Sequence, residues 1–141
     1  MAETARLAEI IAAHAGEEGA LLPILHDVQA AFGCIARAAQ ADIAQALNLS
    51  RAEVHGVVGF YHDFTETPDP RPLVELCRAE ACQARGVEAL VAAAEHAAGA
   101  RVRIGKVWCL GLCSVGPNAR IGDDVHARLD EARLVALVAG A

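Results

Sequence analysis

Apolar residues recur at three- to four-residue spacing through about the first sixty positions, which is the period of one face of an α-helix. The stretch "TARLAEIIAAHAG" places Leu7, Ile10 and His14 on one such face and stops at Gly16. "LLPILHDVQAAFG" repeats the pattern, and "AQADIAQALNLS" gives a shorter version of it. The letters "SRAE" at residues 50–53 fit a capping box at the start of a further helix. The first half of the chain therefore predicts a helical bundle.

The pattern changes after "TETPDPRP", residues 65–72, which holds three prolines and several charges. "PLVELC" is a short apolar run typical of a buried strand, and "RVRIGKV" alternates apolar and basic residues as a second strand would. "GVEALVAAAEHAAG" between them has helical period. A hairpin is expected over "NARIGDDVHARL", followed by a last helix capped by Asp130. We expect an α+β chain: a helical bundle over residues 1–66, then a small α/β unit over residues 71–141.

Composition and charge exclude several classes of protein. The 141 residues are 55% hydrophobic, with 18 acidic against 12 basic side chains and a net charge of -6. This balance argues against nucleic-acid binding, because phosphate neutralisation needs clustered Lys and Arg. The first fifteen residues lack the pattern of a signal peptide, and no run approaches the roughly 20 apolar residues that span a bilayer. We expect a cytoplasmic protein without membrane insertion.

Four of the five cysteines form two close pairs, each in a segment that follows a predicted strand. Cys77 and Cys82 follow the first strand, and Cys109 and Cys113 follow the second. If these strands are neighbours in one sheet, the four sulfurs gather at one end of it. A disulfide scaffold fits poorly with a reducing compartment, and no C-x-x-C redox motif is present. Four thiolates in two pairs suit a zinc site or an iron–sulfur cluster.

The spacing leaves both of these metal centres open. Four residues separate the first pair, three the second, and 26 lie between Cys82 and Cys109. Gly111 and Gly116 favour the iron–sulfur cluster, since glycine lets the backbone pass close to a bulky inorganic core. An ordinary tight turn would also explain these two glycines.

The other candidate residues suggest structural roles. Cys34 is expected to be a small buried hydrophobe. The six histidines lack ligand spacing, and only His62 in "FYHDF" suggests an interface. Trp108 would serve equally as a shield of the cysteine site or as a core anchor.

A rival interpretation comes from "DIAQALNLSRAEVHGVV", which has the rhythm of a helix-turn-helix motif. A redox-sensing or zinc-stabilised regulator would fit that rhythm. However, residues 35–66 hold two arginines against four acidic residues, so the expected recognition helix lacks cations for phosphate contacts.

The order C-x4-C, helix, C-x3-C with "CLGLC…GP" resembles the thioredoxin-like [2Fe–2S] ferredoxin family. Its members include the 24-kDa-type subunit of NADH:quinone oxidoreductase and the corresponding subunits of NAD-linked hydrogenases and formate dehydrogenases. "LLPILHDVQAAFG" and "LNLSRAEVHGVVGFYHDF" are similar to that family's helical N-terminal part. "FYHDF" with "LCRAEACQARG" is most similar to the gamma subunits of NAD-dependent formate dehydrogenases. One departure is the short segment between the cysteine pairs, which we interpret as a trimmed loop.

The resemblance implies a thioredoxin-like fold for the C-terminal unit and one [2Fe–2S] cluster. Carried over by position, Cys77 and Cys82 would bind one iron, and Cys109 and Cys113 the other. It further implies electron exchange with a flavoprotein subunit that binds FMN and reacts with NAD, alongside a larger dehydrogenase subunit. No residue in the chain is expected to be catalytic, so catalysis would reside in those partner subunits.

Overall fold

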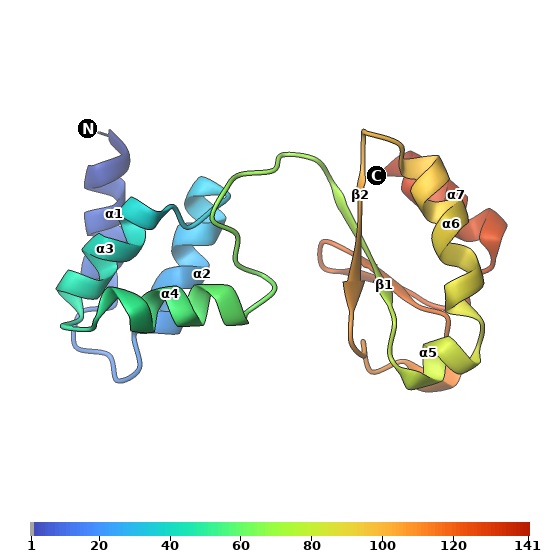
Figure 1. Cartoon of the computed structure of the whole chain (residues 1–141), viewed down its shortest axis with the longest axis horizontal. Coiled ribbons are helices and arrows are strands. Elements are labelled where there is room, and N and C mark those ends of the chain that lie inside the picture. Colours follow the sequence, from blue (N-terminus) through green and yellow to red (C-terminus); the bar gives the residue numbers. More distant parts are fainter. Residues whose placement is uncertain (1) are drawn as a thin grey trace. The chain divides into compact units, whose positions relative to one another are not determined.

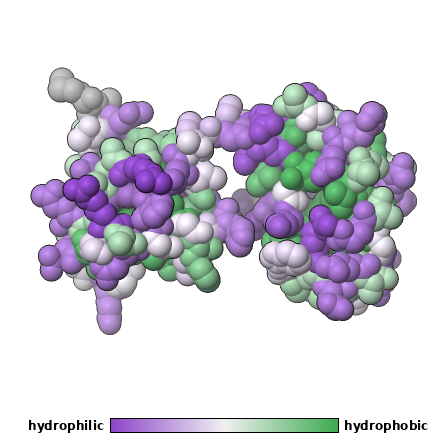
Figure 2. Space-filling view, in the orientation of Figure 1, coloured by the Kyte–Doolittle hydropathy of each residue, from purple (hydrophilic) through white to green (hydrophobic). Residues whose placement is uncertain are grey.

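The computed structural model describes residues 2–141 and divides the chain into two compact units. The first ends at Pro70, and the second comprises Arg71–Ala141. Each unit has its own cluster of buried apolar side chains (Figure 1). On the visible surface of each unit, hydrophilic side chains cover much of the area, and apolar areas lie among these side chains (Figure 2). No helix among residues 2–141 combines the length and the apolar character needed to cross a lipid bilayer.

Four helices build the N-terminal unit: α1 Ala2–Ala13, α2 Leu21–Phe32, α3 Arg37–Ala46 and α4 Arg51–Phe60. Their apolar faces meet in one core, as the helical spacing of these residues predicts. The fully buried members of this core are Ile24, Leu25, Val28, Ile35, Ile43 and Val54. The predicted helical bundle is therefore confirmed.

Local signals in the sequence mark the ends of these helices. Gly33 ends α2 in a left-handed conformation, with φ of 73°, and its N–H donates to the Gln29 carbonyl at 2.8 Å. Ser50 caps α4: its hydroxyl accepts the Glu53 N–H at 3.2 Å, and the Glu53 carboxylate accepts the Ser50 N–H at 2.8 Å. This is the reciprocal capping box that the letters "SRAE" predict.

The C-terminal unit is a four-stranded sheet with helices. Its strands lie in the order β2-β1-β3-β4, with β1 and β2 parallel and the other two pairs antiparallel. The elements follow along the chain as β1 Leu73–Cys77, α5 Glu80–Ala84, α6 Val87–Ala98, β2 Arg103–Val107, the 3₁₀ turn η1 Cys113–Val115, β3 Ala119–Ile121, β4 Asp124–His126 and α7 Glu131–Gly140.

Helices α6 and α7 pack against each other on one side of the sheet (Figure 1). Val74 and Leu76 of β1 alternate with less buried residues and contribute to the core. Leu134 of α7 joins the same core. The prediction of an α+β chain, with a helical bundle followed by a thioredoxin-like α/β unit, is confirmed. Helix α5 was not predicted.

Candidate metal centre

The two predicted strands are neighbours, and this brings the cysteine pairs to one edge of the sheet. Cys77 is the last residue of β1 and pairs in register with Val107, the last residue of β2. Cys109 follows only two residues later. Because the carboxyl ends of parallel strands lie at the same edge, Cys77 and Cys109 start from the same end of the unit.

The second cysteine of each pair lies in a short helical turn. Cys82 is in α5, and Cys113 is the first residue of η1. Both pairs were expected in the segments that follow the two strands, but Cys77 still belongs to β1, and Cys82 and Cys113 lie in helical turns. The two turns contact each other, which brings the second members of both pairs to the same edge.

The two cysteine pairs differ in solvent exposure. The side chains of Cys77 and Cys82 are 2% and 1% exposed, and both belong to the core of the C-terminal unit. Cys109 and Cys113 are exposed, with their sulfurs 3.6 Å apart. One pair is thus anchored in the core, while the other lies at the surface.

The four thiols influence one another electrostatically. Burial acts to raise the pKa of Cys77, but hydrogen bonds from the backbone N–H groups of Ala79, Leu110 and Cys109 and from the Cys82 thiol hold that pKa below its usual value. Burial raises the pKa of Cys82, and the nearby Cys77 raises it further.

In the surface pair, the Cys113 thiol also responds to its neighbours. The hydrogen bond with Cys109 raises the pKa of Cys113, and negative charge on Cys109 and Cys77 adds to this effect. A site that disfavours the simultaneous ionisation of its thiols gains most from a bound cation or cationic metal core. The donor set therefore fits an all-thiolate metal group.

Backbone geometry shapes the segment that carries the surface pair. Cys109 has a φ of 76°, which is rare for a residue with a side chain and costs about 1 kcal/mol. Gly116 passes close to the buried pair, since a Cβ atom there would lie 3.0 Å from the Cys82 sulfur. The absence of a side chain at Gly116 thus leaves room for the Cys82 sulfur.

Asn118 belongs to the site and was missed by the sequence interpretation. Its side chain is 1% exposed, and its amide nitrogen donates to the Leu112 carbonyl at 2.8 Å and towards the Cys82 sulfur at 3.6 Å. Its own backbone carbonyl accepts the Cys77 N–H at 2.9 Å. Nothing in the string "GPNAR" distinguishes this residue from an ordinary turn asparagine, because its burial depends on how β3 returns beside β1.

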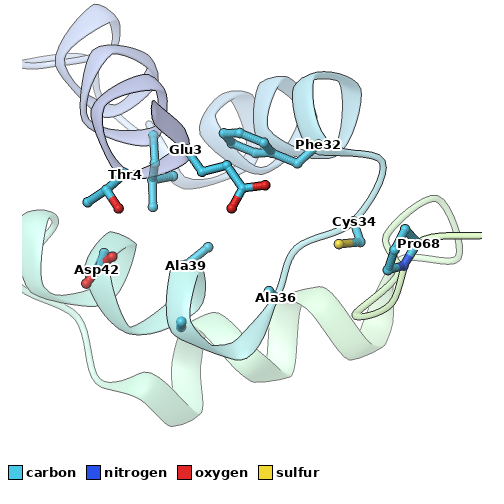
Figure 3. A pocket seen from close by; sticks show the side chains of 10 residues that line it. Glu3, Thr4, Phe32, Cys34, Ala36, Ala39, Asp42 and Pro68 are labelled. Carbon is cyan, nitrogen blue, oxygen red and sulfur yellow. The ribbon is translucent and has the colours of Figure 1, made fainter. Parts of the chain in front are cut away.

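Two other candidate residues lie differently from the expectation. Trp108 is 56% exposed, so it is not a core anchor, and the Lys106 ammonium lies 5.8 Å from its ring centre. Cys34 is only partly buried, against expectation. It lines a cavity of about 290 Å³ in the N-terminal unit together with Glu3, Phe32 and Asp42 (Figure 3).

Two histidines of the N-terminal unit pair with carboxylates. His14 binds Glu17 and Asp27, and His55 lies 3.1 Å from Glu66. Among residues 2–141, no three or more His, Cys, Asp or Glu side chains are placed to hold a single metal ion.

Known proteins are similar to this chain over nearly its whole length. The family model described as thioredoxin-like [2Fe–2S] ferredoxin matches residues 7–141. An E-type subunit of the NADH-quinone oxidoreductase of Rhizobium meliloti (strain 1021) is 33% identical over 128 residues, covering 84% of this chain and 76% of that protein. The NADP-reducing hydrogenase subunit HndA of Solidesulfovibrio fructosivorans is 26% identical, covering 87% of this chain and 77% of that protein.

A solved structure agrees with these sequence relatives. The NAD+-reducing [NiFe]-hydrogenase in its H2-reduced state contains a chain that matches with a TM-score of 0.69 at 30% identity. The match covers 84% of this chain but only 21% of the hydrogenase chain. This chain therefore spans about a fifth of that longer chain's length.

Proposed function

The chain belongs to the thioredoxin-like [2Fe–2S] ferredoxin family, and from this premise we propose that it is the electron-transfer subunit of an NAD-dependent formate dehydrogenase complex. The predicted cofactor, one [2Fe–2S] cluster, is the cofactor of this family. The observation that carries the electron-transfer role is the meeting of two cysteine pairs at the carboxyl ends of two parallel strands.

We assign the ligands as Cys77 and Cys82 on one iron and Cys109 and Cys113 on the other. In a two-iron group each pair would bind one iron, whereas a tetrahedral zinc ion would take all four sulfurs. Membership of the thioredoxin-like [2Fe–2S] ferredoxin family supports the first choice. A bound [2Fe–2S] group supplies one-electron transfer, and Cys₄ clusters of the plant type have potentials near about -400 mV.

The chain's own residues would hold and shield the group. The core position of Cys77 and Cys82 fixes one side of the site, while the exposed Cys109 and Cys113 leave the other side open to a partner. This asymmetry suits a protein that passes electrons across an interface. No catalytic residue is assigned in this chain, so substrate chemistry belongs to the partners.

We propose two partners: a flavoprotein subunit that binds FMN and reacts with NAD, and a larger dehydrogenase subunit. The relatives named as oxidoreductase and hydrogenase subunits support a multisubunit setting. We assign docking to residues 1–66, where Phe60 at the end of α4 is 75% exposed, and cluster binding to residues 71–141. Paired free thiols suit the reducing cytoplasm.

The choice of formate dehydrogenase depends on the resemblance of the segments "FYHDF" and "LCRAEACQARG" to the gamma subunits of NAD-dependent formate dehydrogenases. The alternative is the same role in an NADH:quinone oxidoreductase or an NAD-linked hydrogenase, the kinds of complex named for the relatives. Both possibilities require the same cluster on the same four cysteines, so they differ only in the larger partner.

Metal analysis of anaerobically purified protein tests the cofactor and its ligands. We expect about two irons and two acid-labile sulfides per chain, with a paramagnetic signal that arises only on reduction. Cys82→Ser and Cys109→Ser should each lose or destabilise the cluster. Cys34→Ser is the matched control, because Cys34 lies in the other unit, and it should retain the full visible spectrum. Unchanged spectra in both ligand variants would contradict the assignment.

Isolation of the native complex through a tag on this chain tests the partners. The purified complex should reduce NAD with formate and should contain a flavoprotein subunit. Reduction of NAD with hydrogen instead, or electron transfer from NADH to quinone, would assign the chain to one of the alternative complexes.

A further inference from the structure

Asn118 joins three segments of the cysteine site. It precedes β3, and its backbone carbonyl accepts the N–H of Cys77 at 2.9 Å. Its side-chain nitrogen donates to the carbonyl of Leu112, the residue before Cys113, at 2.8 Å. The same nitrogen lies 3.6 Å from the sulfur of Cys82. One buried residue thus contacts β1, α5 and the segment that carries the surface pair.

The orientation of this amide is fixed by its partners. The Leu112 carbonyl only accepts hydrogen bonds, so the amide nitrogen and not the oxygen must face it. An amide nitrogen has two hydrogens, and the second is available to the Cys82 sulfur. The amide oxygen of Asn118 is buried and has no hydrogen-bond partner among the described residues. Burying an amide oxygen without a partner is unfavourable, and an apolar side chain at this position would avoid that cost. Any favourable contribution of the Asn118 side chain must therefore come from the hydrogen bonds that its nitrogen donates.

We propose that Asn118 is a positioning residue that raises the reduction potential of the cluster through its N–H···S hydrogen bond to Cys82. The proposal rests on the ligand assignment made above. Reduction adds negative charge to an all-thiolate centre, and an N–H aimed at a ligand sulfur stabilises that added charge. The hydrogen bond to Leu112 holds the same amide in place and fixes the start of η1.

Replacement by leucine separates the hydrogen bond from side-chain bulk. Asn118→Leu keeps a similar volume but removes both donated N–H groups. We expect the midpoint potential, measured by spectroelectrochemical titration, to shift to a more negative value. The buried amide Gln40 in the N-terminal unit provides the matched control, because it donates to the Ile35 carbonyl and to Glu66 instead. Gln40→Leu should leave the potential unchanged.

A second measurement needs no substitution. The chain has only two asparagines, Asn48 and Asn118, and Asn48 lies between α3 and α4. Protein made with asparagine labelled with ¹⁵N only at the side-chain nitrogen should show a weak ¹⁵N coupling in pulsed electron paramagnetic resonance of the reduced state. Labelling the side chain alone excludes the backbone N–H of Asn118, which also donates towards Cys82. The coupling should persist in Asn48→Asp.

The outcomes distinguish this inference from the proposed function. A protein that assembles no iron and sulfide would overturn the function itself. A normal cluster that lacks the ¹⁵N coupling would overturn the role of Asn118 alone, as would an unchanged potential in a fully loaded Asn118→Leu variant. If Asn118→Leu fails to retain its cluster, the labelled unsubstituted protein decides the question.

Discussion

Gly116 is the point where the segment of the surface cysteines comes nearest to the buried pair. Its φ of -67° suits any residue, so the backbone conformation does not require glycine. The limited space around this position favours glycine, because an added Cβ would lie 3.0 Å from the Cys82 sulfur and 3.2 Å from the Arg85 side chain. The absence of a side chain at this position therefore preserves the place of a proposed ligand atom.

Gly116→Ala should consequently weaken the site. The Cβ would require the Cys82 sulfur and the Arg85 side chain to shift by a few tenths of an ångström, and overpacking costs about 1–3 kcal/mol where the neighbours cannot move freely. We expect cluster loss under mild chelation to be several-fold faster than in the unsubstituted protein, as followed by visible absorption. Gly59→Ala in α4 is the control, since nothing lies within 4 Å of its Cβ position. It should retain the cluster and stabilise the helix by about 0.5–1 kcal/mol.

Individual residues differ in how far the sequence reveals their roles. The meeting of the four paired cysteines at one edge is predictable, because they follow runs with strand period and parallel neighbours end at one edge. Asn118 is not predictable, since its contact with Cys82 spans 36 positions and requires β3 to pair antiparallel with β1. The exposure of Trp108 is equally unpredictable from the sequence. Trp108 lies beyond the end of a strand, so the alternating pattern of the strand does not tell which side its ring faces.

At the scale of elements, α4 depends on the cap at its N-terminus. The Ser50 N–H and hydroxyl donate to the Glu53 carboxylate and lower the pKa of Glu53. The hydroxyl oxygen in turn accepts the Glu53 N–H, which no carbonyl within the helix could pair. The helix start is thus satisfied by the side chains of two residues.

Ser50→Ala removes the hydroxyl from this cap and should destabilise the N-terminal unit by about 1 kcal/mol. Urea unfolding followed by far-ultraviolet circular dichroism measures the change. Arg51→Ala is the control, because Arg51 is exposed at the first helical position and belongs to neither arm of the cap. Equal destabilisation in both variants would show that the capping box is not the source.

Helices α1 and α2 are joined by His14, whose ring binds Asp27 of α2 and Glu17 at 2.8 Å each. The hydrogen bonds to Asp27 and then to Glu17 raise the pKa of His14 above its usual value of 6.5. A raised pKa in the folded state means that the stabilisation is complete below about 6.5, where the unfolded chain is also protonated. It is lost as the pH rises through the folded-state pKa.

We therefore expect the N-terminal unit to become less stable as the pH rises from about 6 to about 9. Urea midpoints measured across this range should fall in the unsubstituted protein, and the fall should be smaller in His14→Gln. Nuclear magnetic resonance titration of the His14 ring gives the pKa directly. A ring that titrates at or below 6.5 would contradict the two-carboxylate arrangement.

The lengths of the elements explain which of them the sequence reveals. Helices of ten to twelve residues, such as α2 and α6, contain enough turns for an apolar face to recur. Helix α5 has five residues, "EACQA", and too few turns to show a period. Helix α5 carries Cys82. The position of this proposed ligand therefore depends on an element that the sequence pattern does not predict.

At the scale of the whole molecule, the chain holds two separate apolar cores. Leu25 is fully buried in the core of the N-terminal unit, and Leu134 is fully buried in the core of the C-terminal unit. Cys77 and Cys82 belong to the second core and not to the first. The packing around the buried cysteine pair should therefore depend on Leu134 but not on Leu25.

Paired truncations in the full-length chain test this separation. Leu25→Ala and Leu134→Ala each remove a buried leucine side chain, which costs about 2–5 kcal/mol in the unit that contains it. Leu25→Ala should lower the unfolding midpoint of the helical signal while the visible absorption of the cluster survives to its usual denaturant concentration. Leu134→Ala should release the cluster at lower denaturant, because the core that fixes Cys77 and Cys82 loses its packing. Simultaneous loss of helix and cluster in the Leu25 variant would mean that the two units unfold as one. The proposed docking through residues 1–66 could then not be altered independently of the metal site.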